Sequence, residues 1–222
     1  MKLFSTESIH GVQALISRGR VMPVISVSQR ALGVPLANVL YDAGIRVFEI
    51  TLRSPCALQV IEDIRQALPE ATVGAGTVIE TAQVKQVQDA GGQFIVTPGL
   101  TEPLLDALVD SNLPAIPGIV SPSELLQGYQ RGLRCFKFYP AEQAGGVKML
   151  KAFQGPFSGI RFCPTGGLNL NNFMDYLALD NVPIVGGTWL TPNDVVEQQD
   201  WTKITALVHK TQACLKAGRE NE

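Results

Sequence analysis

Short apolar runs recur along the chain at nearly even intervals, and each is followed by a stretch with apolar residues every three or four positions. We interpret the runs as buried strands and the stretches between them as helices. Eight strands are predicted, at residues 21–27, 47–52, 71–78, 94–98, 114–120, 135–139, 160–165 and 183–187. Helices are expected to begin near Leu32, Pro55, Thr81, Glu102, Ser121, Ala144, Leu170 and Asp200. Regular alternation of this kind implies parallel strands.

The alternation predicts an α/β fold, namely a compact (β/α)₈ TIM barrel. Proline follows a capping residue at Ser54 and at Ser121, which supports the helix starts assigned there. An extra N-terminal helix, from about Thr6 to Arg18, is expected to pack against one end of the barrel. A doubly wound open sheet is the alternative. No linker, low-complexity stretch or composition shift divides the chain, so residues 1–222 are predicted to form a single domain.

Charge and cysteine usage narrow the class of protein. The 18 Lys and Arg against 20 Asp and Glu give a net charge of −2, with no basic stripe for nucleic acid or anionic lipid. Small diffusible substrates are therefore expected. The four cysteines are scattered without a CxxC, which favours reduced thiols and a cytoplasmic location. The first twenty residues are typical of an amphipathic helix rather than a signal peptide, and no segment approaches a membrane-spanning length.

Lys137 places a charged amine inside an otherwise apolar strand. Apolar surroundings disfavour an ammonium ion, so they favour a neutral amine that can attack a carbonyl and form a Schiff base. A lysine that extends from the strand end to solvent, or a buried ion pair, is the alternative interpretation.

Glu49 lies in the second predicted strand, where a period of two places Glu49, Thr51 and Arg53 on one side. The other side is expected to face the helices, with the apolar residues Phe48, Ile50 and Leu52. An inward carboxylate suits a general base, and a buried ion pair with Arg53 or Lys137 is the alternative. The planar guanidinium group of Arg53 can bind a carboxylate or a phosphate through two hydrogen bonds. The alternative is that Arg53 is only a surface residue.

Several small polar residues follow the later strands. Thr77 ends a glycine-rich strand, where small residues let a ligand approach the backbone. Two glycine pairs occupy the ends of strands seven and eight, with a threonine beside each: Thr165, Gly166, Gly167, Gly186, Gly187 and Thr188. Loops after these strands are the usual phosphate site of the barrel, so the substrate is expected to be phosphorylated. Ordinary glycine turns are the alternative.

Other chemistries find little support. His10 and His209 lie in the terminal helices and no cysteines cluster, which disfavours a metal site, although a carboxylate-held Mg²⁺ stays open. The chain has no P-loop, no GxGxxG after a strand and no nucleophile elbow. Amine catalysis on a phosphorylated carbonyl compound is the hypothesis that remains.

Six motifs resemble one family: VFEITLR at 47–53, GAGT at 74–77, TPG at 97–99, FKFYPAE at 136–142, CPTGG at 163–167 and GGTW at 186–189. It is the 2-dehydro-3-deoxy-phosphogluconate aldolase family, whose members often also cleave 4-hydroxy-2-oxoglutarate. The resemblance spans nearly the whole chain in unbroken order. It implies a class I aldolase that cleaves 2-dehydro-3-deoxy-6-phosphogluconate to pyruvate and glyceraldehyde 3-phosphate, and 4-hydroxy-2-oxoglutarate to pyruvate and glyoxylate.

The resemblance also implies roles for individual residues. Lys137 matches the Schiff-base lysine and Glu49 the acid/base residue. Arg53, Thr77 and Thr165 match positions that hold the substrate carboxylate and keto-acid end. The phosphate region is matched by Gly166, Gly167, Gly186, Gly187 and Thr188. Many relatives have serine in place of Thr188, and threonine keeps the hydroxyl.

Assembly and specificity are implied less directly. The family resemblance implies a homotrimer that needs no metal and no cofactor. An aldolase for the galactonate epimer is the nearest alternative, because the two substrates differ only at carbon 4. A non-catalytic barrel that binds a phosphorylated sugar acid, and a phosphate-binding isomerase with Glu49 as base, are the more distant alternatives.

Overall fold

A computed structural model describes residues 2–219. Its strands are β1 (Val21–Ile25), β2 (Val47–Thr51), β3 (Thr72–Gly76), β4 (Ile95–Val96), β5 (Ala115–Ile116), β6 (Gly118–Ile119), β7 (Cys135–Phe138), β8 (Arg161–Pro164) and β9 (Val185–Gly187). Its helices are α1 (Thr6–Ser17), the 3₁₀ turn η1 (Arg30–Leu32), α2 (Gly33–Asp42), α3 (Ala57–Ala67), α4 (Thr81–Asp89), α5 (Glu102–Ser111), α6 (Pro122–Gln130), α7 (Gly146–Gln154), α8 (Phe173–Leu177), α9 (Asn193–Glu197) and α10 (Trp201–Arg219).

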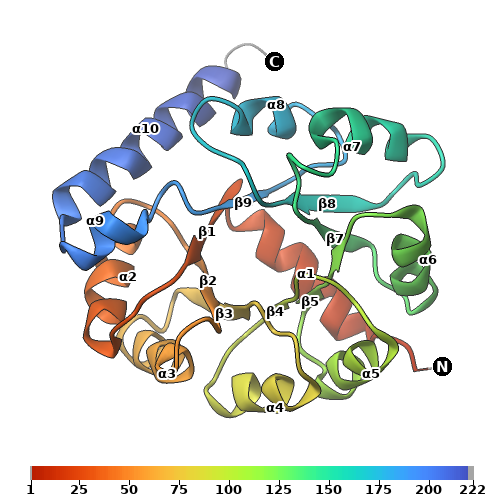
Figure 1. Cartoon of the computed structure of the whole chain (residues 1–222), viewed down its shortest axis with the longest axis horizontal. Helices are drawn as coiled ribbons and strands as arrows, with labels where there is room; N and C mark the ends of the chain where they lie inside the picture. The colour runs from red at the N-terminus through yellow and green to blue at the C-terminus, as the bar shows by residue number, and fades with distance from the viewer. Residues whose placement is uncertain (1, 220–222) are drawn as a thin grey trace.

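The strands form a parallel, curled sheet at the centre, with helices α2 to α8 and α10 around it (Figure 1). Six strands pair in the order β5-β4-β3-β2-β1-β9 and three in the order β6-β7-β8, and every pairing is parallel. The first strand therefore pairs with the last. A doubly wound sheet reverses its strand order at a switch point, so that alternative is wrong.

Two local features differ from the expected strands. The strand expected at 114–120 is split at Pro117 into β5, which pairs with β4, and β6, which pairs with β7. Proline has no N–H to donate to a ladder, which accounts for the break. Between β8 and β9 the structure has a single parallel bridge, from Thr165 to Gly186. The fold is thus an α/β fold with a curled parallel sheet.

Helix positions agree with the sequence pattern to within about three residues. The helices expected near Thr81 and Glu102 begin at these residues, and α6 begins at Pro122, where Ser121 and Glu124 form a reciprocal capping box. The short α9 and the 3₁₀ turn η1 were not expected. Within residues 2–219, no helix is both long and apolar enough to cross a membrane.

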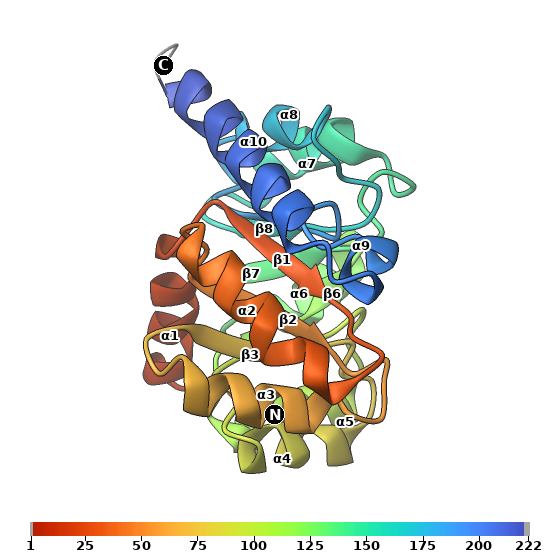
Figure 2. The same cartoon turned by 90° about the vertical axis from the view of Figure 1, so that its left-hand side faces the viewer.

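The core has two layers, one on each face of the sheet. Phe48 and Ile50 pack between the sheet and the helices, with Leu52 beside them, which confirms the predicted outward side of β2. A second cluster fills the inside of the curled sheet: Met22, Val47, Phe94, Val96, Ile116, Cys135, Cys163 and Ile184. Val12 and Leu15 of α1 belong to this inner cluster. Figure 2 shows α1 at the end where the strands begin, which confirms the extra helix against one end.

Candidate active site

Lys137 and Glu49 meet inside the curled sheet. Lys137 of β7 is 5% exposed and Glu49 of β2 is fully buried, and the Lys137 Nζ atom lies 3.1 Å from Glu49 Oε1. Within the described chain, the other Glu49 oxygen, Oε2, is buried without a hydrogen-bond partner. The ion pair foreseen for Glu49 therefore forms, with Lys137 and not Arg53 as its partner. One carboxylate oxygen is left to meet a further donor.

Lys137 and Glu49 are next to the inner apolar cluster. Val47 and Cys135 stand two residues earlier on the same strands, and the alternation of a strand places them on the same inward face. Cys163 is the register partner of Lys137 on β8. Burial, helped by the Glu49 carboxylate, raises the pKa of the Cys163 thiol to about 12, although Lys137 acts to lower it. Cys163 is therefore a neutral neighbour that limits polar contacts of the pair from one side.

Gly76 leaves room for the Glu49 carboxylate. A Cβ atom at Gly76 would lie 2.1 Å from Glu49 Oε1, a distance that requires Glu49 or the backbone to move. Gly74 on the same strand is crowded in the same way, by Phe94. The glycines of β3 thus leave space for side chains of neighbouring strands, including the Glu49 carboxylate.

Arg53 and Thr77 form a second polar pair at the rim. The inward alternation expected for β2 holds for Glu49 and Thr51, but the strand ends at Thr51 and Arg53 is exposed in the following turn. Arg53 Nε donates to Thr77 Oγ1 at 3.2 Å. Thr77 has a φ of 57°, a left-handed conformation that a β-branched residue rarely adopts. Such strain concentrates at functional sites, which makes this turn a candidate for ligand contact.

Thr165, Gly166 and Gly167 follow β8. Thr165 is 5% exposed and its backbone N–H donates to the Phe138 carbonyl, beside Lys137. Gly166 and Gly167 have φ values of 101° and 83°, which favour glycine. The loop is fixed in place because the Gly167 carbonyl accepts hydrogen bonds from two asparagine side chains, those of Asn169 and Asn172.

Gly186 and Gly187 belong to β9 and are both buried. A Cβ atom at Gly186 would lie 2.4 Å from Thr165 Oγ1, and one at Gly187 would lie 1.9 Å from the Trp189 ring. These two glycines therefore allow the strand end to pack against its neighbours. Thr188, directly after the strand, is exposed.

Arg53 and Thr188 line one cavity of about 410 Å³ at the carboxyl ends of the strands, together with Ser26, Trp189, Pro192 and Asn193. A neighbouring cavity of about 300 Å³ shares Ser26, Arg53 and Asn193. Neither Ser26 nor Asn193 was expected from the sequence pattern. A polar residue directly after an apolar strand was the available signal for Ser26, and Asn193 begins the unexpected helix α9.

Glu142 and Tyr176 form a contact that sequence reasoning also missed. The buried Tyr176 hydroxyl donates to Glu142 Oε1, and the backbone N–H of Glu142 donates to the Gly166 carbonyl at 3.1 Å. A Cβ atom at Gly167 would lie 2.5 Å from Glu142 Cγ. Burial raises the pKa of Tyr176, and the neighbouring Glu142 carboxylate raises it further. Glu142 thus links the glycine loop after β8, through its backbone N–H, to α8, through its side chain.

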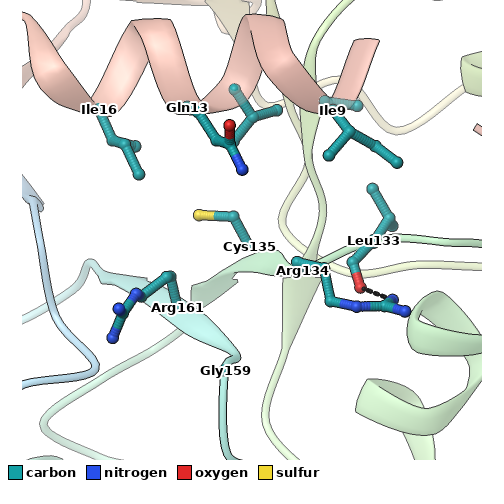
Figure 3. A pocket seen from close by; sticks show the side chains of 10 residues that line it. Ile9, Gln13, Ile16, Leu133, Arg134, Cys135, Gly159 and Arg161 are labelled. Atoms are coloured by element: carbon teal, nitrogen blue, oxygen red, sulfur yellow. Dashed lines mark hydrogen bonds between the residues drawn. The ribbon is translucent and has the colours of Figure 1, made fainter. Parts of the chain in front are cut away.

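Another cavity, of about 260 Å³, lies at the opposite end of the sheet, beneath α1. Figure 3 shows Ile9, Gln13 and Ile16 extending from α1 toward Cys135, with Arg134 and Arg161 at the sides. This cavity is lined by α1 and by residues near the ends where the strands begin. It is therefore separate from the Lys137 and Glu49 pair. Among residues 2–219, no group of three or more His, Cys, Asp or Glu side chains is placed to hold a metal ion.

The chain is similar to known proteins in sequence and in fold. The family model described as KDPG and KHG aldolase matches residues 2–207. A 2-dehydro-3-deoxy-phosphogluconate aldolase from Dickeya dadantii is 50% identical over 201 residues, which covers 90% of this chain and 94% of the relative. A KHG/KDPG aldolase from Escherichia coli K12 is 49% identical over 198 residues, covering 89% and 93%.

A solved structure is similar as well. The KDPG aldolase from Legionella pneumophila, determined with pyruvate captured as a covalent carbinolamine intermediate, superposes with a TM-score of 0.87 at 43% identity. The match covers 89% of this chain and 96% of that one. From its sequence and its fold, the chain belongs to the KDPG and KHG aldolase family.

Proposed function

We propose that this protein is a class I aldolase that cleaves 2-dehydro-3-deoxy-6-phosphogluconate, the compound called KDPG, to pyruvate and glyceraldehyde 3-phosphate. It also cleaves 4-hydroxy-2-oxoglutarate, or KHG, to pyruvate and glyoxylate. The observation that carries the proposal is the buried contact between Lys137 Nζ and Glu49 Oε1 at 3.1 Å. An amine and a carboxylate at this distance can exchange a proton directly, as imine formation requires.

In the proposed mechanism, Lys137 transfers a proton to Glu49 and its neutral amine attacks carbon 2 of the substrate. Glu49 returns the proton to the carbinolamine hydroxyl, which leaves as water and gives a protonated imine. The regenerated carboxylate then removes the proton from the hydroxyl on carbon 4. The bond between carbons 3 and 4 breaks, its electrons pass into a lysine-bound enamine, and the aldehyde departs. Glu49 protonates carbon 3 of the enamine, and water releases pyruvate and the lysine.

The unpartnered Glu49 Oε2 supports this assignment, because a buried carboxylate oxygen without a partner is costly unless a substrate group satisfies it. Arg53 and Thr77 are proposed to hold the substrate carboxylate and Thr165 the keto-acid end. Their support is the contact of Arg53 with Thr77 and the position of Thr165 beside the strand of Lys137.

The phosphate is proposed to lie over Gly166, Gly167, Gly186, Gly187 and Thr188. The exposed Thr188 hydroxyl is the side-chain donor of this group, and the loop of Gly166 and Gly167 is held in place by Glu142. Because Thr188 shares a cavity with Arg53, the two ends of one substrate can be held at the same opening.

Architecture and assembly complete the proposal. The curled sheet is proposed to be a (β/α)₈ barrel of one domain, supported by the pairing of β1 with β9 and by the bridge between Thr165 and Gly186. The chain is proposed to form a homotrimer and to need no cofactor, as the family resemblance implies. The free thiols of Cys56, Cys135, Cys163 and Cys214 support the proposal of a reducing, cytoplasmic location.

Borohydride reduction in the presence of pyruvate, followed by peptide mass spectrometry, tests the mechanism. One reduced pyruvyl adduct on Lys137 is expected, and none in Lys137→Arg, because a guanidinium is a poor nucleophile. Lys151→Ala, which removes an exposed lysine of α7, is the control and keeps the adduct. A folded wild-type protein without an adduct would refute the aldolase mechanism.

A further inference from the structure

Ser26 lies at the carboxyl end of β1, between the two groups proposed to hold opposite ends of the substrate. The sheet order β2-β1-β9 places β1 between the strand that leads to Arg53 and the strand that leads to Thr188. Ser26, Arg53 and Thr188 line the same cavity. A substrate that reaches from Arg53 to Thr188 therefore passes its middle carbons in front of Ser26.

The hydroxyl of Ser26 has a defined hydrogen-bond direction. Ser26 Oγ lies 2.6 Å from Thr51 Oγ1, and Thr51 Oγ1 donates to the Ile25 carbonyl at 3.0 Å. A threonine hydroxyl has one proton, and that of Thr51 is used by the Ile25 carbonyl. The proton between the two hydroxyls must therefore come from Ser26, which leaves the lone pairs of Ser26 Oγ as its remaining hydrogen-bonding capacity.

Burial of Thr51 keeps the direction of the hydrogen bond from Ser26 to Thr51 fixed. Thr51 is 1% exposed, so its hydroxyl is shielded from water and retains its two partners. Ser26 itself is half-buried and lines the cavity. An oxygen fixed as an acceptor favours a ligand hydroxyl, which can donate to it, over a carbonyl or a phosphate oxygen.

We propose that Ser26 is a specificity-determining residue, which accepts a hydrogen bond from the hydroxyl on carbon 5 of the phosphorylated substrate. This hydroxyl becomes the carbon 2 hydroxyl of glyceraldehyde 3-phosphate. The inference rests on the proposed function, in which Glu49 serves the carbon 4 hydroxyl and leaves that on carbon 5 for another acceptor. The substrate 4-hydroxy-2-oxoglutarate has a carboxylate carbon at that position, so Ser26 does not contribute in the same way to its binding.

The test uses the condensation direction, in which pyruvate is joined to either of two aldehydes. Glyceraldehyde 3-phosphate has the hydroxyl in question, and 3-phosphooxypropanal lacks only that group. Wild type is expected to prefer the first aldehyde in kcat/KM, and Ser26→Ala is expected to reduce this preference about tenfold, as for loss of one well-formed hydrogen bond. Ser28→Ala is the matched control. Its hydroxyl donates to Glu197 at 2.6 Å, and the variant is expected to keep the preference between the aldehydes.

Two further readouts keep the outcomes distinct. Cleavage of 4-hydroxy-2-oxoglutarate and the borohydride-trapped adduct on Lys137 are expected to stay near wild type in Ser26→Ala, which shows that the site is intact. An equal loss toward both aldehydes, or an unchanged preference, in an adduct-forming Ser26→Ala protein overturns the inference alone. Absence of the adduct in wild type overturns the proposed function, and this inference with it.

Discussion

Lys137 Nζ lies 3.1 Å from Glu49 Oε1, and both side chains are almost wholly shielded from water. Removing two charges from water costs several kcal/mol per ion, and their attraction seldom gives a net stabilisation. The pair is therefore poorly explained as a device for stability. The pair lies inside a curled parallel sheet, on strands whose carboxyl ends are where enzymes of this architecture gather their reacting groups.

Replacing Glu49 by glutamine is expected to separate imine formation from turnover. The side-chain amide of this variant cannot accept the proton from the carbon 4 hydroxyl, so kcat for cleavage is expected to fall by about 10²–10⁴-fold, the usual contribution of a general base. Lys137 is still present, so slow formation of the pyruvate adduct is expected. Coupled measurement of pyruvate release, together with borohydride trapping, checks both effects. Turnover within a few-fold of wild type contradicts the role of Glu49.

Breaking the pair is expected to destabilise the fold more than removing it. Lys137→Met leaves the Glu49 carboxylate buried without a partner, and a loss of about 3–5 kcal/mol in the free energy of unfolding is expected. Adding Glu49→Leu is expected to restore most of that loss, because two apolar side chains then fill the same space. Urea unfolding of the single and double variants measures the difference. A double variant no more stable than Lys137→Met contradicts the expectation.

Gly76→Ala is expected to impair catalysis by displacing Glu49. The new methyl group would lie 2.1 Å from Glu49 Oε1, and a shift of about 1 Å in a reacting group costs about 10²-fold in rate. Gly99→Ala is the control, since a Cβ atom there meets nothing within 4 Å. Steady-state kinetics of the two variants, compared at matched folding by circular dichroism, check the claim. Equal activities would show that Glu49 tolerates the methyl group.

The buried thiols are expected to resist alkylation in the folded protein. Burial raises the pKa of Cys163 to about 12, so this thiol stays protonated at pH 8, and only thiolates react rapidly. Burial also raises the pKa of Cys135. Iodoacetamide at pH 8 is therefore expected to label the half-buried Cys56 and Cys214 first.

The same shift has a consequence for stability. A pKa higher in the folded state means that the unfolded chain loses the thiol proton first, so the contribution of Cys163 to stability is full below about pH 9 and decreases as the pH rises toward 12. Peptide mass spectrometry after timed iodoacetamide labelling shows in which order the cysteines react. Rapid modification of Cys163 in native protein contradicts it.

Tyr176→Phe is expected to loosen the glycine loop after β8. The variant removes the hydroxyl that holds Glu142, whose backbone N–H donates to the Gly166 carbonyl. A severalfold rise in KM for the phosphorylated substrate is expected, as for the loss of one hydrogen bond that positions a loop. KM for 4-hydroxy-2-oxoglutarate, which has no phosphate, is expected to change little. Equal rises for both substrates would indicate a general loss of folding.

The central pair was predictable because each member breaks a local rule. A lysine or a glutamate within an apolar strand contradicts the pattern around it, and such contradictions mark functional or strained sites. That the two residues meet was not predictable, because Glu49 and Lys137 are 88 positions apart in the chain. Their contact depends on how the sheet curls. The sequence pattern therefore identified both residues and left their partners open.

Ser26 and Glu142 were not singled out, because a serine at a strand end and an exposed glutamate break no rule. Their importance arises from neighbours supplied by other segments: Thr51 for Ser26, and Tyr176 for Glu142. The break at Pro117 was readable from the sequence, since proline rarely continues a ladder, but the apolar run around it outweighed that signal.

The helix α1 covers the end of the sheet where the strands begin, with Val12 and Leu15 in contact with the inner cluster. In the proposed function, the substrate then reaches the Lys137 amine from the opposite end, where Arg53 and Thr188 line a cavity. Both products of cleavage leave through the entrance that admitted the substrate. The three-carbon piece bonded to the lysine lies behind the aldehyde, so the aldehyde departs first and pyruvate second. Steady-state inhibition is therefore expected to follow an ordered scheme, in which pyruvate competes with the substrate for the empty enzyme.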